Sequence, residues 1–569
     1  MLPEPAKATS VKKSFRGNRM KNKLLSTVAT SVVAASLACN PAFAAGYTNP
    51  NNLPTATPIK HVVIIFNENR SFDHYFATYP KAANPPGEIP FVAKPHTPTV
   101  ANLATAGLLT NNPNDTNAAN GTGAANPFRL DRTQAHTASD NHDYTAEQQA
   151  YDNGKADLFP KYTGVGTPGG VGAFGTNGQV MGYFDGNTVT ALWNYAQNFA
   201  MNDNHYTDTY GPSTPGAIAV VSGQNNGAIE PAGTSGQLPD GQGGLTVIGD
   251  PDPAYDACSS TSGTVQMTSK NIGDLLNAAQ ISWGSFMGGF DLTRTNINGT
   301  TGCARSTFSS VINGTTGDYI PHHASFQYYK STSNPTHARP SSLQAVGHTL
   351  EPNGETLDPA NHQYDLEDLY SAILAGNFPA VSYVKLPAYQ DSNPGYSDPL
   401  DEQEGTVQLI NFLQQQPDWD STLVIITYDD SDGWYDHLYA KPTWASYDPT
   451  ADQVNGPGKC GAGVATQVQP NGVKGKPVNG RCGPGTRVPF IVVSPFAKPN
   501  YVSAKRITQS SVVRFIEDNW LNGQRLGGGS LDATSGLIAD MLDFTQTPNN
   551  KLFLDPVAGT VVVSVPEGH

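Results

Sequence analysis

Basic residues are scarce in this sequence. The 569 residues include 33 Lys and Arg against 48 Asp and Glu, which gives a formal net charge of −15. Nucleic-acid binding needs clustered Lys and Arg to contact phosphates, so no nucleic-acid partner is expected. The same scarcity argues against a surface held to anionic lipid by charge. Solubility alone is a sufficient reason for the acidic excess.

Cysteine is also rare, and long apolar runs are missing beyond the N-terminus. None of the five cysteines has CxxC spacing, which argues against a Cys-rich zinc site. No run after residue 44 is long enough for a transmembrane segment. Length alone would allow two or three domains. Because neither a linker nor a fixed-period repeat divides the chain, we expect one domain over residues 45–569.

The first 44 residues have the pattern of a secretory signal peptide. Basic residues precede an apolar run of small residues from Leu24 to Ala38, and Ala42-Phe43-Ala44 is a small-x-small cleavage pattern. The run is too short to be a permanent membrane span. We therefore expect export, to the periplasm or the exterior. The mature chain would have 26 basic and 47 acidic residues and a formal charge of −21.

Four cysteines remain after the predicted cleavage. An even number in an exported protein predicts two disulfides. Four cysteines allow three pairings. We favour Cys258–Cys303 with Cys460–Cys482, because each pair would close one Gly-rich excursion of the chain. Both bonds would be structural.

Short apolar runs rich in β-branched residues predict buried parallel strands. The clearest are residues 61–66, 380–384, 423–427 and 488–493. Helical patterns lie between them, as at 405–415 and 508–520, and the low-complexity segment 102–126 predicts a surface loop. Strands that alternate with helices predict an α/β fold with a doubly wound sheet. Ligands of such sheets bind beyond the carboxyl ends of the strands.

Two of these strand ends carry oxygen ligands. Glu68 and Asn69 follow the first apolar run side by side, which suits a divalent cation that prefers oxygen; the alternative is a polar turn with an Asx cap. Asp429 and Asp430 follow the run at 423–427, where adjacent carboxylates repel unless a cation or a shared proton compensates. The alternative there is an Asp-Gly turn with solvated carboxylates. A divalent metal ion is the expected cofactor.

Ser213 lies in the turn Gly211–Gly216, ahead of an apolar stretch. One interpretation is an ordinary helix N-cap with proline early in the first turn. The functional interpretation uses the same geometry, since phosphate oxygens bind at helix N-termini and a nearby cation would stabilise the serine alkoxide. Histidines such as His142 and the pair His322-His323 lie in polar segments. A lone loop histidine is usually incidental.

Several of these segments resemble the bacterial phosphoesterase family, which includes secreted phospholipases C and enzymes of the acid phosphatase A type. The segments are ENRSFDHYF (68–76), GPSTPG (211–216), YIPHHASFQYY (319–329) and YDDSDGWYDH (428–437). The likeness runs from about residue 58 to 557. It implies an alkaline-phosphatase-like fold, with a central, mostly parallel sheet flanked by helices in a single large domain with long loops.

The resemblance also implies roles for individual residues. The metal ligands would be Glu68, Asn69, Ser213, Asp429 and Asp430. Ser213 would also be the nucleophile, with Thr214 as the second candidate. His142 and His323 would be the catalytic histidines, and His322 would contact the substrate.

Position 393 departs from the family pattern. The resemblance predicts a histidine there, and this chain has Asn393. An asparagine can bind a phosphoryl oxygen but cannot transfer a proton, so Asn393 is expected to bind substrate. His437 is an alternative proton donor.

The expected function is that of an exported, metal-dependent phosphoesterase that hydrolyses phosphate monoesters through a phosphoserine. Ser213 and the Asp429-Asp430 pair favour this acid-phosphatase-like activity. A phospholipase C that cleaves phospholipid diesters is the alternative. The expected substrate is therefore a small phosphate ester or a phospholipid. A non-catalytic secreted metal-binding protein is the third hypothesis.

Overall fold

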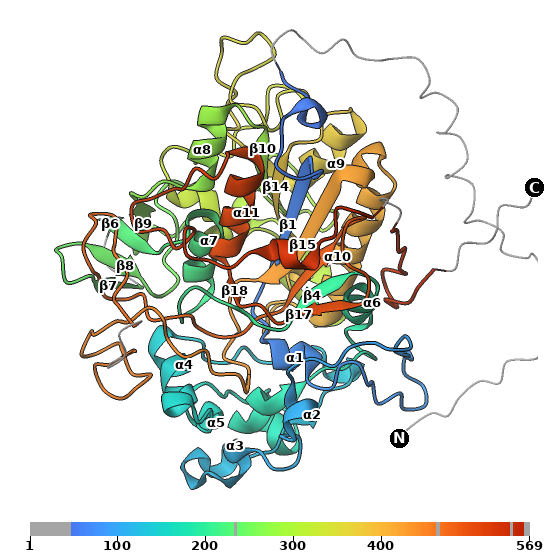
Figure 1. Ribbon diagram of the computed structural model, residues 1–569, viewed down its shortest axis with the longest axis vertical. Coiled ribbons are helices and arrows are strands. Elements are labelled where there is room, and N and C mark those ends of the chain that lie inside the picture. Colours follow the sequence, from blue (N-terminus) through green and yellow to red (C-terminus); the bar gives the residue numbers. More distant parts are fainter. Residues whose placement is uncertain (1–46, 233–235, 462–466, 547–549, 563–569) are drawn as a thin grey trace, which may run out of the picture. The chain divides into compact units, whose positions relative to one another are not determined.

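A mostly parallel sheet forms the centre of the molecule (Figure 1). The computed structural model describes residues 47–232, 236–461, 467–546 and 550–562; the predicted signal peptide lies outside them. The sheet has eight strands in the order β13-β10-β14-β1-β15-β16-β4-β17. In that order their bounds are Gln363–Asp365, Trp283–Met287, Val381–Lys385, His61–Asn67, Thr422–Tyr428, Phe490–Val493, Ala200–Asn202 and Tyr501–Ser503.

The strand β1 lies between β14 and β15 and runs parallel to both. All three strands are buried along their length, as expected for β-branched runs covered on both faces. These strand predictions are confirmed. The prediction at 488–493 is right in position but wrong in direction, because β16 runs antiparallel to β15 and β4. An apolar run predicts that a strand is buried but not in which direction it runs. Here β16 begins beside the end of β15 and runs back along it.

Helices cover both faces of the sheet (Figure 1). One group is α7 (Ser213–Ser222), α8 (Ile272–Ala279) and α11 (Ser510–Trp520), and the other is α6 (Thr190–Asn198), α9 (Leu366–Leu374) and α10 (Pro399–Gln414). The helix α10 begins six residues before the predicted range. The Asp398 side chain accepts the backbone N–H groups of Leu400 and Asp401, and proline occupies the first helical position. The predicted α/β class is confirmed.

Shorter elements lie outside the main sheet. Four of them are α1 (Phe72–Phe76), which follows β1, α4 (Tyr144–Tyr151), α5 (Phe159–Tyr162) and a 3-10 turn at Pro321–His323. The small strand pairs are β2 (Phe128–Arg129) with β3 (Gly182–Tyr183), β5 (His205–Tyr206) with β18 (Ile507–Thr508), and β11 (Ser306–Ser309) with β12 (Gly314–Gly317). An antiparallel sheet contains β6 (Asn226–Ala232), β7 (Gln237–Pro239), β8 (Leu245–Val247) and β9 (Thr264–Met267). No helix within the described ranges is long and apolar enough to cross a bilayer.

The segment 102–126 is only partly exposed, with Asn102, Asn112 and Asn114 buried, and it is not the irregular surface loop that was predicted. It contains three short helices, each begun by an asparagine whose side chain accepts a backbone N–H. They are α2 (Leu103–Ala106), α3 (Pro113–Thr116) and the 3-10 helix Ala118–Gly123, capped by Asn102, Asn112 and Asn117. The composition that predicted a loop supplies these caps.

Two excursions from the sheet are closed by disulfides. Cys258 is bonded to Cys303 with the Cα atoms 5.3 Å apart, and Cys460 to Cys482 with the Cα atoms 5.7 Å apart. These are the two pairings favoured from the sequence.

Candidate active site

The candidate site lies where three adjacent parallel strands end. Lys385 is the last residue of β14, Glu68 follows β1, and Asp429 with Asp430 follows β15. The carboxyl ends of parallel strands meet at one edge of a sheet, so the register of β1 with its neighbours brings these side chains together. All four residues are buried.

Ser213 joins this group from the first turn of α7. Its Oγ lies 3.0 Å from Glu68 Oε2, 3.2 Å from Asp430 Oδ2 and 3.4 Å from the Asn69 side-chain amide, so its single proton can be donated to one of these groups. The interpretation of Ser213 as a helix cap is wrong, because Pro212 occupies the N-cap position and Ser213 is the first residue of the helix. The hydroxyl is therefore directed at the carboxylates.

The backbone at the two strand ends is held by hydrogen bonds between them. Asn69 has a positive φ of 53° and donates its backbone N–H to Asp429 Oδ1 at 3.0 Å. Asparagine tolerates this left-handed conformation better than most residues. Arg70 N in turn donates to the backbone oxygen of Asp430 at 3.0 Å. The five predicted metal ligands are thus brought together in one buried cluster.

This cluster fits a divalent cation. Burial raises the pKa of Asp429 well above its usual range, and the charges of Glu68 and Asp430 raise it further. Asp429 Oδ2 is buried and has no hydrogen-bond partner among the described residues. A hard cation would satisfy this oxygen, and carboxylate, amide and hydroxyl oxygens are the ligands it prefers. The donor chemistry agrees with the predicted metal site.

His142 approaches the cluster from the segment before α4. Its Nδ1 lies 2.8 Å from the Asp140 backbone oxygen and 3.2 Å from Asp432 Oδ1, and its Nε2 lies 3.4 Å from the Asn69 side-chain amide. Burial disfavours the charged ring, but the carboxylates of Asp430 and Asp432 outweigh it and raise the pKa of His142 to about 10. A protonated His142 therefore points Nε2 towards the site.

The two adjacent histidines face different partners. His323 is buried, with Nε2 3.3 Å from Glu68 Oε2 and Nδ1 3.5 Å from Asp391 Oδ2. Burial lowers its pKa well below the ordinary value, despite the opposing charge of Glu68. His322 is half-buried, and its Nδ1 lies 3.7 Å from Asp252 Oδ1. Of the pair, His323 is the one that contacts the carboxylate cluster.

Asn393 and Thr214 are also placed differently from one another. Asn393 Nδ2 donates to Glu68 Oε2 at 3.2 Å, so this side chain belongs to the cluster. Thr214 Oγ1 lies 3.3 Å from the Tyr328 hydroxyl, and its backbone N–H donates to Asp250 Oδ1 at 2.8 Å. The structure therefore favours Ser213 over Thr214 as the nucleophile candidate.

Sequence reasoning missed Lys385 and Asp432. Lys385 forms a buried ion pair with Glu68 Oε1, which places a fixed cation within the cluster. It directly follows the predicted strand 380–384, so the strand-end rule applied to Glu68 could have identified it. The backbone N–H of Asp432 donates to Asp430 Oδ1, and its side chain contacts His142. No local sequence signal marks that second contact.

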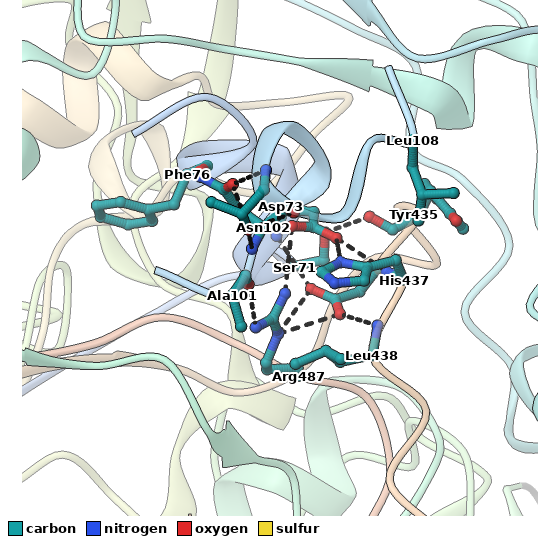
Figure 2. A network of polar contacts seen from close by, with 12 residues as sticks. Ser71, Asp73, Phe76, Ala101, Asn102, Leu108, Tyr435, His437, Leu438 and Arg487 are labelled. Atoms are coloured by element: carbon teal, nitrogen blue, oxygen red, sulfur yellow. Dashed lines mark hydrogen bonds and ion pairs between the residues drawn. The ribbon is translucent and has the colours of Figure 1, made fainter. Parts of the chain in front are cut away.

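A second polar cluster ties the segments after β1 and β15 together (Figure 2). Arg487 is buried and bonds Asp73 Oδ1 at 3.2 Å and both Asp436 oxygens at 3.1 Å. Asp73 Oδ2 accepts from His437 N at 2.9 Å and lies 2.5 Å from its Nδ1. His437, the alternative proton donor, is therefore engaged in this cluster. Asp73, Asp436 and His437 could together hold a metal ion, but Arg487 already neutralises the two carboxylates.

Comparison with known proteins identifies the family. The model of the phosphoesterase family matches residues 59–521. The chain belongs to the phosphoesterase family. The matched range includes the segments ENRSFDHYF, GPSTPG and YDDSDGWYDH, which carry Glu68, Ser213, Asp429 and Asp430.

Among its curated relatives, this phosphoesterase is similar to the non-hemolytic phospholipase C of Pseudomonas aeruginosa, with 25% identity over 87% of this chain and 58% of the relative. Phospholipase C A of Mycobacterium tuberculosis is 22% identical over 87% of this chain and 79% of the relative. The chain spans between half and two thirds of the length of the Pseudomonas relatives. A solved alkaline phosphatase, PafA, covers 62% of this chain at 11% identity with a TM-score of 0.28, and 94% of that chain is matched. A TM-score that low carries no functional inference.

Proposed function

We propose that this phosphoesterase hydrolyses phosphate monoesters through a phosphoserine formed on Ser213. The observation that supports the proposal best is the position of Ser213 Oγ, within 3.0–3.4 Å of Glu68, Asp430 and the Asn69 amide. A serine hydroxyl in contact with buried oxygen ligands is the arrangement expected for a metal-activated nucleophile.

The expected metal ligands are Glu68, Asn69, Ser213, Asp429 and Asp430. A divalent cation bound there would lower the pKa of the serine hydroxyl and neutralise charge on the phosphoryl oxygens. Lys385 and protonated His142 would add two positive groups close to the same position. Such preorganised charge stabilises the transition state of phosphoryl transfer.

The proposed reaction has two steps. In the first, Ser213 Oγ attacks phosphorus in line with the leaving alcohol while its proton passes to Asp430, whose Oδ2 lies 3.2 Å from Oγ and whose pKa is raised by burial. The bond from phosphorus to the leaving oxygen breaks, and His142 protonates that oxygen from Nε2. In the second step water attacks the phosphoserine and gives a proton to neutral His142. The bond from phosphorus to Ser213 Oγ breaks, and Oγ takes back the proton held by Asp430.

Asn393 and His323 would bind the phosphoryl group. Both contact Glu68 Oε2, at 3.2 Å and 3.3 Å respectively. A neutral His323 can donate a hydrogen bond, and Asn393 can do so through Nδ2. His322 would contact the substrate beyond the phosphoryl group, because it is half-buried and turned towards Asp252.

Phosphodiester cleavage is the second candidate. It is favoured by the similarity of 22–25% to proteins named phospholipase C over 87% of the chain. We further propose export by the N-terminal segment, which the two disulfides support because such bonds persist in oxidising compartments.

The decisive experiment compares a chromogenic phosphate monoester with the matching phosphocholine diester. Purified protein loaded with Mn²⁺, Zn²⁺ or Ca²⁺ would be assayed beside Ser213→Ala and the matched control Thr214→Ala. Monoester turnover that is lost in Ser213→Ala but kept in Thr214→Ala supports the serine phosphatase. Predominant diester turnover supports a phospholipase C. Activity that persists in Ser213→Ala contradicts the proposed nucleophile, and no turnover with any cation favours a non-catalytic metal-binding protein.

A further inference from the structure

Glu147 is a buried carboxylate that the proposed reaction does not use. It lies on α4 with a relative exposure of 1%. Within the described part of the chain it forms no ion pair with a lysine or an arginine, and burial raises its pKa to about 7. Burying a carboxylate without such a partner is costly. Hydrogen bonds to the carboxylate therefore have to offset the cost of burying it.

Both carboxylate oxygens of Glu147 accept hydrogen bonds from segments that carry site residues. Oε2 accepts from the backbone N–H of Gly211 at 2.9 Å, and Oε1 accepts from Ser431 Oγ at 2.7 Å. Gly211 lies two residues before Ser213, and Ser431 directly follows Asp430. One side chain thus bridges the turn of the nucleophile and the turn of a carboxylate ligand.

Glu147 and Asp250 both accept backbone N–H groups from the nucleophile turn, which the Gly211–Gly216 segment forms. Gly211 has a φ of 119°, a conformation that side chains rarely permit. The N-cap residue Pro212 makes no side-chain capping hydrogen bond, and the first turn of α7 is held from outside by Asp250, which accepts from Thr214 N at 2.8 Å. The hydrogen bond from Gly211 to Glu147 restrains the chain just before Ser213, whereas the bond from Thr214 to Asp250 restrains it just after.

These contacts close a ring. On one side Ser213 Oγ meets Asp430 Oδ2 at 3.2 Å, and on the other Gly211 is joined to Ser431 through Glu147. A shift of either turn would change the separation of the nucleophile from its carboxylate neighbour. Misplacement of reacting groups by about 1 Å can cost about 100-fold in rate.

We propose that Glu147 is a positioning residue that sets the approach of Ser213 to Asp430 by bridging Gly211 and Ser431. It does not touch the substrate and acts only through these two turns. The catalytic part of this inference rests on the proposed phosphoserine mechanism, whereas the structural part concerns the geometry of the metal ligands themselves.

Three substitutions separate positioning from simple stability. Glu147→Gln keeps both contacts, since its amide oxygen can accept from Gly211 and its nitrogen can donate to Ser431. Glu147→Met has a similar length and makes neither contact. Ser431→Ala breaks one contact and leaves the other, so it tests the bridge if Glu147→Met fails to fold. Gln149→Ala, on a partly exposed position of the same helix, is the control.

The first readout is steady-state turnover of the better of the two substrates. The expected result is a fall in kcat of about 100-fold in Glu147→Met, a smaller fall in Ser431→Ala, and near wild-type kcat in Glu147→Gln and Gln149→Ala. KM should change little in all four variants. Folded Glu147→Met and Ser431→Ala proteins with wild-type kcat would overturn the inference.

The second readout does not depend on activity. Mn²⁺ binding to the metal-free protein, followed by electron paramagnetic resonance, reports on the ligand geometry that Ser213 shares. The dissociation constant should rise about tenfold in Glu147→Met, as for other residues that orient metal ligands, and stay unchanged in Glu147→Gln. If wild-type protein binds Mn²⁺ but hydrolyses neither substrate, the proposed function fails while this readout still decides the role of Glu147. Equal Mn²⁺ affinity in all folded variants would overturn the proposed positioning role of Glu147.

Discussion

Lys385 and Glu68 form a buried ion pair at the carboxyl ends of the adjacent strands β14 and β1. The lysine side chain is 8% exposed and the glutamate 1%. Removing one partner of a buried pair leaves the other charge buried without compensation. The resulting loss in the free energy of unfolding is larger than the net contribution of the intact pair. Among the described residues, Lys385 is the lysine or arginine that forms an ion pair with a carboxylate of this cluster.

Replacing Lys385 should therefore destabilise the metal-free protein far more than the metal-bound one. In Lys385→Met, we expect a loss of about 3–5 kcal/mol in the free energy of unfolding without metal. Added Mn²⁺ should recover most of this loss, because a bound cation would compensate the same carboxylates. Urea unfolding with and without Mn²⁺ measures both quantities.

Lys505→Met is the matched control for that substitution. Lys505 pairs with Asp540, but its side chain is 70% exposed. Solvent screens exposed pairs, so the loss of this pair should have little effect on stability, with or without metal. An equal effect of Mn²⁺ on both variants would show that Lys385 does not compensate the carboxylate cluster.

The sequence predicts the carboxylate cluster well because Glu68 and Asp429 lie within two residues of the ends of apolar strand runs, and Lys385 directly follows another such run. Once such runs are assigned to neighbouring parallel strands, the sheet itself brings the following residues to one edge. Only the strand pairing has to be right. The same reasoning would have identified Lys385 as a residue of this cluster.

Other parts of the structure could not be predicted because they depend on packing between distant segments. The hydrogen bond between Glu147 and Gly211 joins residues 64 positions apart, and a glutamate on a short helix is ordinarily exposed. The direction of β16 depends on where the long connection from β15 re-enters the sheet. A composition rich in asparagine, as at 102–126, is equally compatible with a loop and with a series of capped turns.

The pair of His437 and Asp73 predicts a specific pH dependence of stability. Burial disfavours the charged imidazole, but the Asp73 carboxylate outweighs it and raises the pKa of His437 above its ordinary value near 6.5. A group with a raised pKa contributes its full stabilisation below the unfolded pKa and loses it as the pH rises through the folded pKa. Asp73 has a lowered pKa, because His437 and Arg487 outweigh the effect of burial, so it stays ionised in mild acid.

His437→Gln should therefore reduce the free energy of unfolding most between about pH 4 and 6.5, and progressively less as the pH rises. Urea unfolding of wild type and variant at pH 5 and pH 9 provides the comparison. The control is His136→Gln, since His136 is exposed and should give no difference at either pH. A loss that is the same at pH 5 and pH 9 would mean that His437 contributes through packing and not through its charge.

The two disulfides should differ in accessibility to reductant. Cys460 and Cys482 are fully buried, whereas Cys303 is exposed. Thiol–disulfide exchange requires access of the attacking thiolate to a sulfur. Under native conditions, limited dithiothreitol followed by a mass-tagged alkylating agent should therefore label Cys258 and Cys303 first.

Loop length and burial have opposite effects on the relative stabilisation expected from the two disulfides. The bonded cysteines are 45 and 22 residues apart, so loop entropy predicts losses of about 4 kcal/mol for Cys258→Ser/Cys303→Ser and about 3 kcal/mol for Cys460→Ser/Cys482→Ser. The second pair is buried, which adds the cost of placing two polar hydroxyls in the core. We therefore expect the buried pair to be the more damaging to remove in practice, although its loop is shorter. Urea unfolding of the two double variants tests this order, and a larger loss for the exposed pair would show that loop entropy outweighs burial.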